Sequence, residues 1–170
     1  MPNERRGVPY RQAGLMRVDN ALVEEVSAPS RSHGSLLISY AVPGPSNLSF
    51  VEQLQLNIRP GTLVLNALGR PVCFCDIRPG TWIDAFFSPM RTRSIPPQSA
   101  AFLIAVRRSA QGPAAVQLTV GPVASVNPEQ NLLFVGDRWN PERQTRFVLT
   151  DTAVVSSRDG TPISLESLRP

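Results

Sequence analysis

The sequence predicts an all-β protein built from two related small β-barrel or sandwich repeats, the second of which is incomplete at its C-terminal end. Short apolar runs of strand length alternate with turn clusters rich in proline and glycine, of which the chain has 17 and 11. This punctuation is typical of all-β chains. Apolar residues make up 42% of the chain and charged residues 18%, which is enough apolar side chain to fill a core. The third observation is an internal repeat.

The internal repeat places Gln53–Pro79 on Gln144–Pro170 with one constant offset, 160 − 69 = 91. Six aligned pairs are identical, and six more exchange one apolar residue for another. Upstream, Leu36–Ile38 matches Leu132–Phe134 at an offset of 132 − 36 = 96, and two valine pairs match at an offset of 100. Kept strands and varied loops are expected of a structural repeat. The identical pairs are Gln53/Gln144, Val64/Val155, Gly69/Gly160, Pro71/Pro162, Arg78/Arg169 and Pro79/Pro170, and the upstream valine pairs are Val23/Val123 and Val26/Val126.

The first repeat is expected over residues 14–108, after a polar segment, residues 1–13, that is expected to be flexible. Several of its apolar runs alternate, so that Leu54, Leu56 and Ile58 share one face of a strand. The sequence Arg59–Gly61 predicts a tight hairpin turn from this strand into the next. The expected strands are Leu15–Val26, Ser35–Val42, Val51–Ile58, Thr62–Asn66, Arg70–Phe74, Trp82–Phe87 and Ala100–Val106.

The second repeat is expected over residues 115–170, after a linker at 109–114. One segment in each repeat departs from the strand pattern, because Cys73–Gly80 matches Ser164–Pro170 and places apolar residues at i, i+3 after a good N-cap residue, Ser164. This pattern predicts a single helical or 3₁₀ turn that packs two apolar side chains onto the end of a barrel. The expected strands are Val116–Val126, Leu132–Val135, Thr145–Leu149, Ala153–Ser157 and a short run at Ile163–Leu165.

The order of strand, turn, apolar turn and Pro-Gly resembles the small, roughly OB-like β-barrel repeat modules of bacterial proteins of unknown function. The resemblance covers about a dozen residues in each copy and implies a fold but no ligand, because such barrels carry many functions. It is carried by Gly69, Pro71, Val72, Phe74, Ile77, Pro79 and Gly80 in the first copy, and by Gly160, Pro162, Ile163, Leu165, Leu168 and Pro170 in the second.

The second repeat has no counterpart of the strands expected at Trp82–Phe87 and Ala100–Val106. The segment Val8–Met16 resembles Ile95–Leu103 with one gap, so the N-terminal residues 8–18 are one candidate for a closing strand. The other candidates are strands from a neighbouring subunit, an open curled sheet, or a longer array of which this chain is a fragment. Unpaired strand edges invite pairing with another chain. The partners expected are therefore a second copy of the chain or another protein.

The net charge of the chain is +4, and all of its positively charged side chains are arginines, since the chain has no lysine. A compositional bias explains this use of arginine, and selection for bidentate contacts to phosphate or carboxylate is the alternative. The first residues show no apolar signal segment, and no run approaches about 18 apolar residues. We therefore expect a cytoplasmic protein without a membrane partner.

Few side chains are candidates for catalysis or metal binding. Cys73 and Cys75 would supply two zinc ligands where a site usually needs four, so we expect two ordinary half-buried thiols. His33 is the only histidine and lies among loop residues, which leaves no material for a nucleophile and base pair. The carboxylates are scattered without acid–base or calcium spacing. We expect no catalytic residue, no cofactor and no metal, and hence no enzyme.

The best candidate for ligand binding is the long loop Pro89–Gln98, which carries Arg91 and Arg93. These two arginines are candidates for contact with an anion or a nucleic-acid backbone. Trp82 and Phe86 are expected on one face of the preceding strand as aromatic platforms, and Trp139 is a further aromatic residue in a polar loop. The alternative is that the aromatic residues are core and that the arginines only solvate the loop.

The sequence thus favours a non-catalytic structural or protein-interaction module that assembles through unpaired strand edges. The alternative is an OB-like barrel that binds nucleic acid or another polyanion through its Arg-bearing loop.

Overall fold

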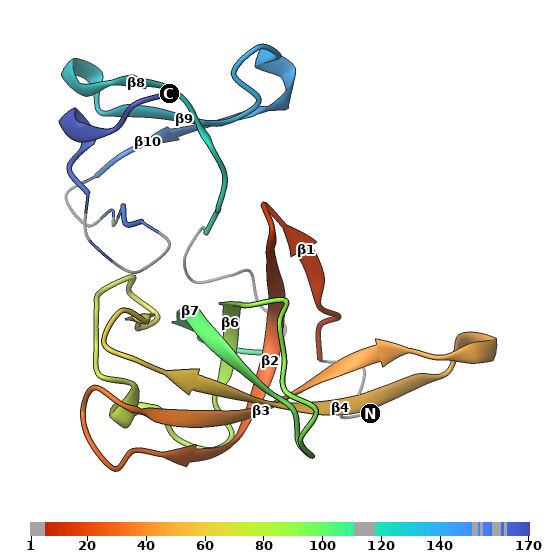
Figure 1. Cartoon of the computed structure of the whole chain (residues 1–170). Helices are drawn as coiled ribbons and strands as arrows, with labels where there is room; N and C mark the ends of the chain where they lie inside the picture. Colours follow the sequence, from red (N-terminus) through yellow and green to blue (C-terminus); the bar gives the residue numbers. More distant parts are fainter. Residues whose placement is uncertain (1–5, 111–117, 151–152, 154, 158–160, 162) are drawn as a thin grey trace. The chain divides into compact units, whose positions relative to one another are not determined.

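The computed structural model describes residues 6–110, 118–150, 153, 155–157, 161 and 163–170, and divides the chain into two compact units, Met1–Gln117 and Leu118–Pro170. Every regular element of the described residues is a β-strand or a three-residue 3₁₀ turn (Figure 1). The prediction of an all-β protein is therefore confirmed. Among the described residues, no helix is long and apolar enough to cross a membrane.

The first unit contains seven strands in one sheet (Figure 1). Strands pair in the order β1-β2-β3-β4-β7-β5, and β6 pairs with both β2 and β7. Hydrogen bonding therefore runs from β2 through β3, β4, β7 and β6 and returns to β2. The elements of this unit are β1 (Tyr10–Gln12), β2 (Leu15–Ser27), β3 (Gly34–Pro43), η2 (Pro45–Asn47), β4 (Ser49–Ile58), β5 (Leu63–Leu65), η3 (Phe74–Asp76), β6 (Trp82–Phe87) and β7 (Gln98–Val106).

Apolar side chains from β2 to β7 and from the η3 turn form one core inside this ring of strands. The predicted alternation on β4 is confirmed, because Leu54, Leu56 and Ile58 are buried while Gln53 is exposed. The core residues include Val18, Val23, Leu36, Ile38, Leu54, Leu56, Val64, Phe74, Ile77, Ile83, Ala85, Phe87, Ala101 and Ile104.

A bulge in β2 is held by a buried ion pair that includes Asp84 of β6. Asn20 has a positive φ of 65°, and the β2–β6 register shifts between Val18 and Ala21. The Asn20 N–H donates to Asp84 Oδ1 at 2.8 Å, and Arg107 Nη1 donates to both carboxylate oxygens of Asp84 at 2.7 and 3.0 Å. Asp84 of β6 thereby joins β2, at the point where its register changes, to the residue that follows β7.

The N-terminal residues differ from the flexible segment expected over 1–13. Within the described part, β1 pairs antiparallel with β2, and Tyr10 lies opposite Arg17. The Gly7 N–H donates to the Asn20 carbonyl at 2.9 Å, and Gly7 O accepts from the Ala41 N–H at 3.0 Å. This segment, one candidate for a strand that closes the second repeat, therefore belongs to the sheet of the first unit.

The prediction of a hairpin turn at Arg59–Gly61 is wrong. β4 and β5 both run parallel to β7 and pair with successive parts of it, β4 with Gln98–Ala100 and β5 with Leu103–Ala105. The turn closes locally, since Thr62 N donates to Arg59 O at 2.9 Å, but Thr62 Oγ1 also donates to the Ala101 carbonyl at 2.8 Å. The chain is therefore shifted along β7 rather than reversed.

The second unit contains a three-stranded antiparallel sheet in the order β10-β9-β8. The strand expected at Val116–Val126 begins only at Val123, and its first two residues lie outside the described part of the chain. Of the run expected at Ala153–Ser157, the described residues form one bridge position at Ser156 and no strand, and the run at Ile163–Leu165 leads into a 3₁₀ turn. The elements are β8 (Val123–Asn127), η4 (Pro128–Gln130), β9 (Leu132–Gly136), η5 (Pro141–Arg143), β10 (Gln144–Val148) and η6 (Leu165–Ser167).

Strand registers in the two units follow the same pattern. Val23 lies opposite Ile38 and the β2–β3 register shifts before Glu25; Val123 lies opposite Val135 and the β8–β9 register shifts before Ser125. The corresponding offsets are 123 − 23 = 100 and 135 − 38 = 97. Leu56 pairs with Leu36, and Phe147 pairs with Leu133, which gives 147 − 56 = 91 and again 133 − 36 = 97.

The structure corrects one offset of the sequence alignment. The match of Leu36–Ile38 to Leu132–Phe134, at an offset of 96, is one residue out of register with these pairings. A slip of one residue moves every side chain of a strand to the other face. The offset of 97 places buried Leu36 on Leu133, which is the most buried residue of β9.

The predicted 3₁₀ turns are confirmed as η3 and η6. In the first unit Phe74 and Ile77 are buried against the core, as expected. In the second unit Ser164 stands at the N-cap position but makes no capping hydrogen bond with its side chain. Its hydroxyl instead lies 2.8 Å from the Ser167 hydroxyl.

Candidate functional site

The Arg-bearing loop connects β6 to β7 and is closed by polar contacts of its own residues. The Thr92 N–H donates to the Gln98 carbonyl at 3.0 Å, and the Gln98 N–H donates to Thr92 Oγ1 at 2.9 Å. The peptide bond between Ile95 and Pro96 is cis. Met90 and Ile95 are exposed to 81% and 100%, so the loop projects its apolar side chains away from the core.

Arg91 and Arg93 are both exposed, but Arg91 has acidic and phenolic neighbours. Its Nη1 lies 4.0 Å from Glu52 Oε2 and donates to the Tyr40 hydroxyl at 3.4 Å. Burial raises the pKa of Tyr40, while the Arg91 charge opposes that shift. Glu52 therefore offsets part of the positive charge that the sequence assigned to this loop.

The predicted aromatic platforms do not gather beside these arginines. Phe86 is only 1% exposed, and the Arg17 guanidinium lies 5.0 Å from its ring centre. The prediction that Phe86 offers a ring face to a ligand is therefore wrong, because residues 83–87 of β6 are all buried and both faces of the strand are covered. Trp82 is half-buried. Trp139 is 84% exposed and belongs to the second unit, where the Arg138 guanidinium lies 5.2 Å from its ring centre.

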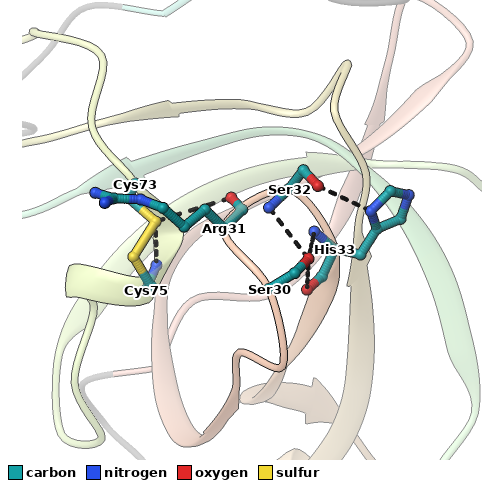
Figure 2. The surroundings of a disulfide bond; sticks show 6 residues. All are labelled: Ser30, Arg31, Ser32, His33, Cys73 and Cys75. Atoms are coloured by element: carbon teal, nitrogen blue, oxygen red, sulfur yellow. Dashed lines mark hydrogen bonds between the residues drawn. A yellow bond between two sulfur atoms is a disulfide. The ribbon is translucent and has the colours of Figure 1, made fainter.

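Cys73 and Cys75 form a disulfide bond, where the sequence suggested two separate thiols (Figure 2). The η3 turn brings their Cα atoms to 5.1 Å, within the usual range for a disulfide. Both residues are half-buried. Disulfides persist in oxidising compartments, so the bond gives no support to the expected cytoplasmic location.

The disulfide lies beside the loop between β2 and β3, and that loop holds the histidine. Cys73 Sγ is 3.9 Å from the Arg31 carbonyl oxygen (Figure 2). His33 is exposed, as expected of a loop histidine, with its Nδ1 3.0 Å from Ser32 Oγ. No group of three or more potential metal ligands occurs among the residues that the structure describes.

The turn that carries the disulfide also forms in the second unit without cysteine. Asp76 N donates to Cys73 O at 3.1 Å, and Ser167 N donates to Ser164 O at the same distance. The positions of Cys73 and Cys75 are held there by Ser164 and Glu166. The bond closes so short a loop that its chain-entropy contribution is only roughly 1–2 kcal/mol.

The outer strands of the second unit form a different candidate surface. Within the described part of the chain, β8 and β10 each pair on one side only, with β9. Val148 on β10 is 62% exposed, and Ser125 on β8 is also exposed. Only Ala124 and Leu133 of this unit are buried among its described hydrophobic residues.

Two buried or partly buried polar clusters were missed by sequence reasoning. One is the Asp84–Arg107 pair, whose side chains are 3% and 9% exposed. The other joins Glu24 Oε1 to the Ser39 hydroxyl at 2.6 Å and to Arg6 Nη2 at 3.3 Å. Their members are far apart in sequence and follow no motif, so no local signal could have found them.

The chain matches no protein-family model, no curated protein and no solved structure. The expected resemblance to OB-like repeat modules therefore stays a prediction.

Proposed function

We propose that the protein is a non-catalytic interaction module whose second unit repeats the β2–η3 part of the first, and that two copies of the chain associate through the outer edge of β8. Three features support the repeat. The register shifts after Val23 in β2 and after Val123 in β8, the strand pairings match, and each unit has a 3₁₀ turn at the corresponding place. Among the described residues β8 and β10 each pair on one side only, and such open strand edges support association.

The observation that carries the proposal is the lack of charged residues on the open edge of β8. At the offset of 100, Glu24 and Glu25 of β2 correspond to Ala124 and Ser125 of β8. Charged side chains on an edge strand oppose pairing with another chain, because they would have to be desolvated or opposed by like charge. In the first unit β2 is paired on both sides, by β3 and by β6, and the carboxylate of Glu24 contacts Ser39 and Arg6. β8 has neither glutamate, and within the described residues it pairs on one side only.

A second copy is the occupant favoured by charge. Antiparallel pairing of two β8 strands centred on Ser125 places Val123 opposite Asn127 and Ala124 opposite Val126. No charged residue occurs in β8, so this register opposes no like charges. β10, the other outer strand, carries Arg146 at its centre, and the equivalent symmetric pairing would oppose two arginines.

The second unit also has more to gain from a partner than the first. In the first unit β6 and β7 add Ile83, Phe87 and Ile104 to the core. The core residues of β2, β3 and β4 that have counterparts in the second unit are fully buried. In the second unit Val123, Val135 and Phe147, which correspond to buried Val23, Ile38 and Leu56, are only half-buried. Association that covers such residues is favourable.

Light scattering on a sizing column tests the proposal. The wild-type chain is expected as a dimer of 2 × 18.5 = 37 kDa, and Ser125→Glu, which restores the residue type of the first unit, is expected as a monomer. Thr145→Glu, at an exposed position of β10, is the matched control and should remain dimeric. A wild-type monomer at all concentrations, or a Ser125→Glu dimer that is as stable as the wild type, would overturn the proposal.

Polyanion binding through Arg91 and Arg93 remains the alternative hypothesis. Exposure of the two arginines is its support, but Glu52 lies beside Arg91 and Phe86 is buried. The interaction module is therefore the function that the geometry favours.

A further inference from the structure

The Cys73–Cys75 disulfide is poorly placed to stabilise the fold. It spans two positions in sequence and closes within a turn that the second unit forms with serine and glutamate. The backbone hydrogen bonds of the two turns match, since Ile77 N donates to Phe74 O at 3.0 Å and Leu168 N donates to Leu165 O at 3.3 Å. A disulfide that constrains so few residues removes little entropy from the unfolded chain.

The surroundings distinguish the two sulfur atoms. The Cys75 N–H donates to Cys73 Sγ at 3.2 Å, and a backbone donor of this kind stabilises negative charge on the sulfur that accepts it. The Arg31 backbone lies against Cys73 Sγ, with its carbonyl oxygen at 3.9 Å (Figure 2). The carbonyl oxygen of Arg31 opposes negative charge on Cys73 Sγ, but it lies farther from the sulfur than the Cys75 N–H does. The amide donor therefore decides the assignment, and Cys73 is the leaving thiolate.

We propose that Cys73–Cys75 is a thiol–disulfide exchange site that accepts a thiol substrate at Cys75. A substrate thiolate attacks Cys75 Sγ, a bond forms between the two sulfurs, and the Cys73–Cys75 bond breaks with its electron pair passing to Cys73. The Cys73 thiolate then takes up a proton. A second substrate thiol, after deprotonation, attacks the mixed disulfide, which releases an oxidised substrate disulfide and leaves two reduced cysteines. Two thiols are oxidised and one disulfide is reduced.

The substrate class follows from the position of the site. Both cysteines are half-buried at the surface end of the core, and the neighbouring Pro71 and Asp76 are exposed. Because both residues keep part of their surface exposed, a small thiol or a thiol on an extended peptide is the substrate class that suits the site. Phe74, between the two cysteines, is 2% exposed and anchors the turn whether or not the bond is present.

Titration with reduced and oxidised glutathione tests whether the bond exchanges in the folded protein. Alkylation followed by intact mass should show complete reduction by glutathione with far-ultraviolet circular dichroism unchanged. The variant Cys73→Ser/Cys75→Glu, which copies the residues of the second unit, is the matched control and should fold without reacting. A bond that resists glutathione until denaturant is added, or a reduced protein that loses its fold, would overturn the proposal.

Trapping of the intermediate tests the assignment of the two sulfurs. Rapid alkylation during reduction, followed by peptide mapping, should place the glutathione adduct on Cys75 and the alkyl group on Cys73. An adduct found mainly on Cys73 would reverse the assignment and contradict the role given to the Cys75 N–H.

Discussion

At the scale of single residues, Asp84 of β6 connects Asn20 of β2 to Arg107, which directly follows β7. Its carboxylate accepts the amide of the β2 bulge and the guanidinium of Arg107. The sequence predicted a strand over Trp82–Phe87, and that strand is present as β6. It gave no sign of the ion pair, because a carboxylate in a strand is ordinarily exposed and its partner lies on β7's C-terminal side.

Replacement of Asp84 by alanine should lower the free energy of unfolding of the first unit by about 3–5 kcal/mol, because the buried Arg107 charge loses its carboxylate. Trp82 and Trp139 lie in different units, so the substitution is made in a Trp139→Phe background and urea unfolding is followed by Trp82 fluorescence. The exposed Trp139 ring makes this background change mild.

The control for Asp84→Ala is Glu52→Gln in the same background. Glu52 and Arg91 are 49% and 42% exposed and 4.0 Å apart, so their pairing contributes at most about 1 kcal/mol. Equal losses for the two variants would show that the Asp84–Arg107 pair behaves as a surface ion pair.

At the scale of elements, the sequence predicted strands and turns better than their connections. Alternation in β4 and the apolar spacing in η3 are local patterns, and both were confirmed. The direction of the chain after Arg59 depends on which strand lies beside it. β5 follows β4 along β7 because β7 is long enough to pair with both, and no residue between 59 and 62 encodes that length.

Gly34 joins two of these elements, the β2–β3 pair and the η3 turn. A Cβ at this position would overlap the Ser27 carbonyl oxygen and lie 2.6 Å from Phe74 Cζ. Both neighbours are fixed, since Ser27 pairs with Ser35 and the Phe74 ring is buried. Gly34→Ala should therefore lower the free energy of unfolding of the first unit by about 2–3 kcal/mol through overpacking.

The same Trp82 measurement of unfolding in urea checks Gly34→Ala against Gly80→Ala. Gly80 has a φ of +89° and open space around the added Cβ, so its substitution should cost only about 1 kcal/mol of backbone strain. A Gly34→Ala loss no larger than that of Gly80→Ala would mean that Phe74 has room to move.

At the scale of the whole molecule, the sequence alignment of the two units agrees with the strand pairings at its ends but is one residue out of register in the middle strand. The offset of 91 came from identical residues, and the offset of 100 from two valines, and both agree with the strand pairings. The offset for the middle strand was one residue out, because consecutive apolar residues in Leu36–Ile38 and Leu132–Val135 align equally well in two ways. Backbone pairing distinguishes them, whereas hydrophobicity alone does not.

Hydrogen exchange should report how far the second unit depends on assembly. Because many of its apolar residues are only half-buried, the second unit has fewer buried apolar contacts than the first. The local opening that exposes its amides to exchange should therefore cost less free energy. Association stabilises the associated state by mass action, and we therefore expect amide protection in β8 and β9 to rise with protein concentration. Protection in β3 and β4, whose core is complete within the first unit, should stay constant. Ser125→Glu should abolish the rise in β8, and a rise of equal size in β3 and β4 would show that assembly does not act through the edge of the second unit.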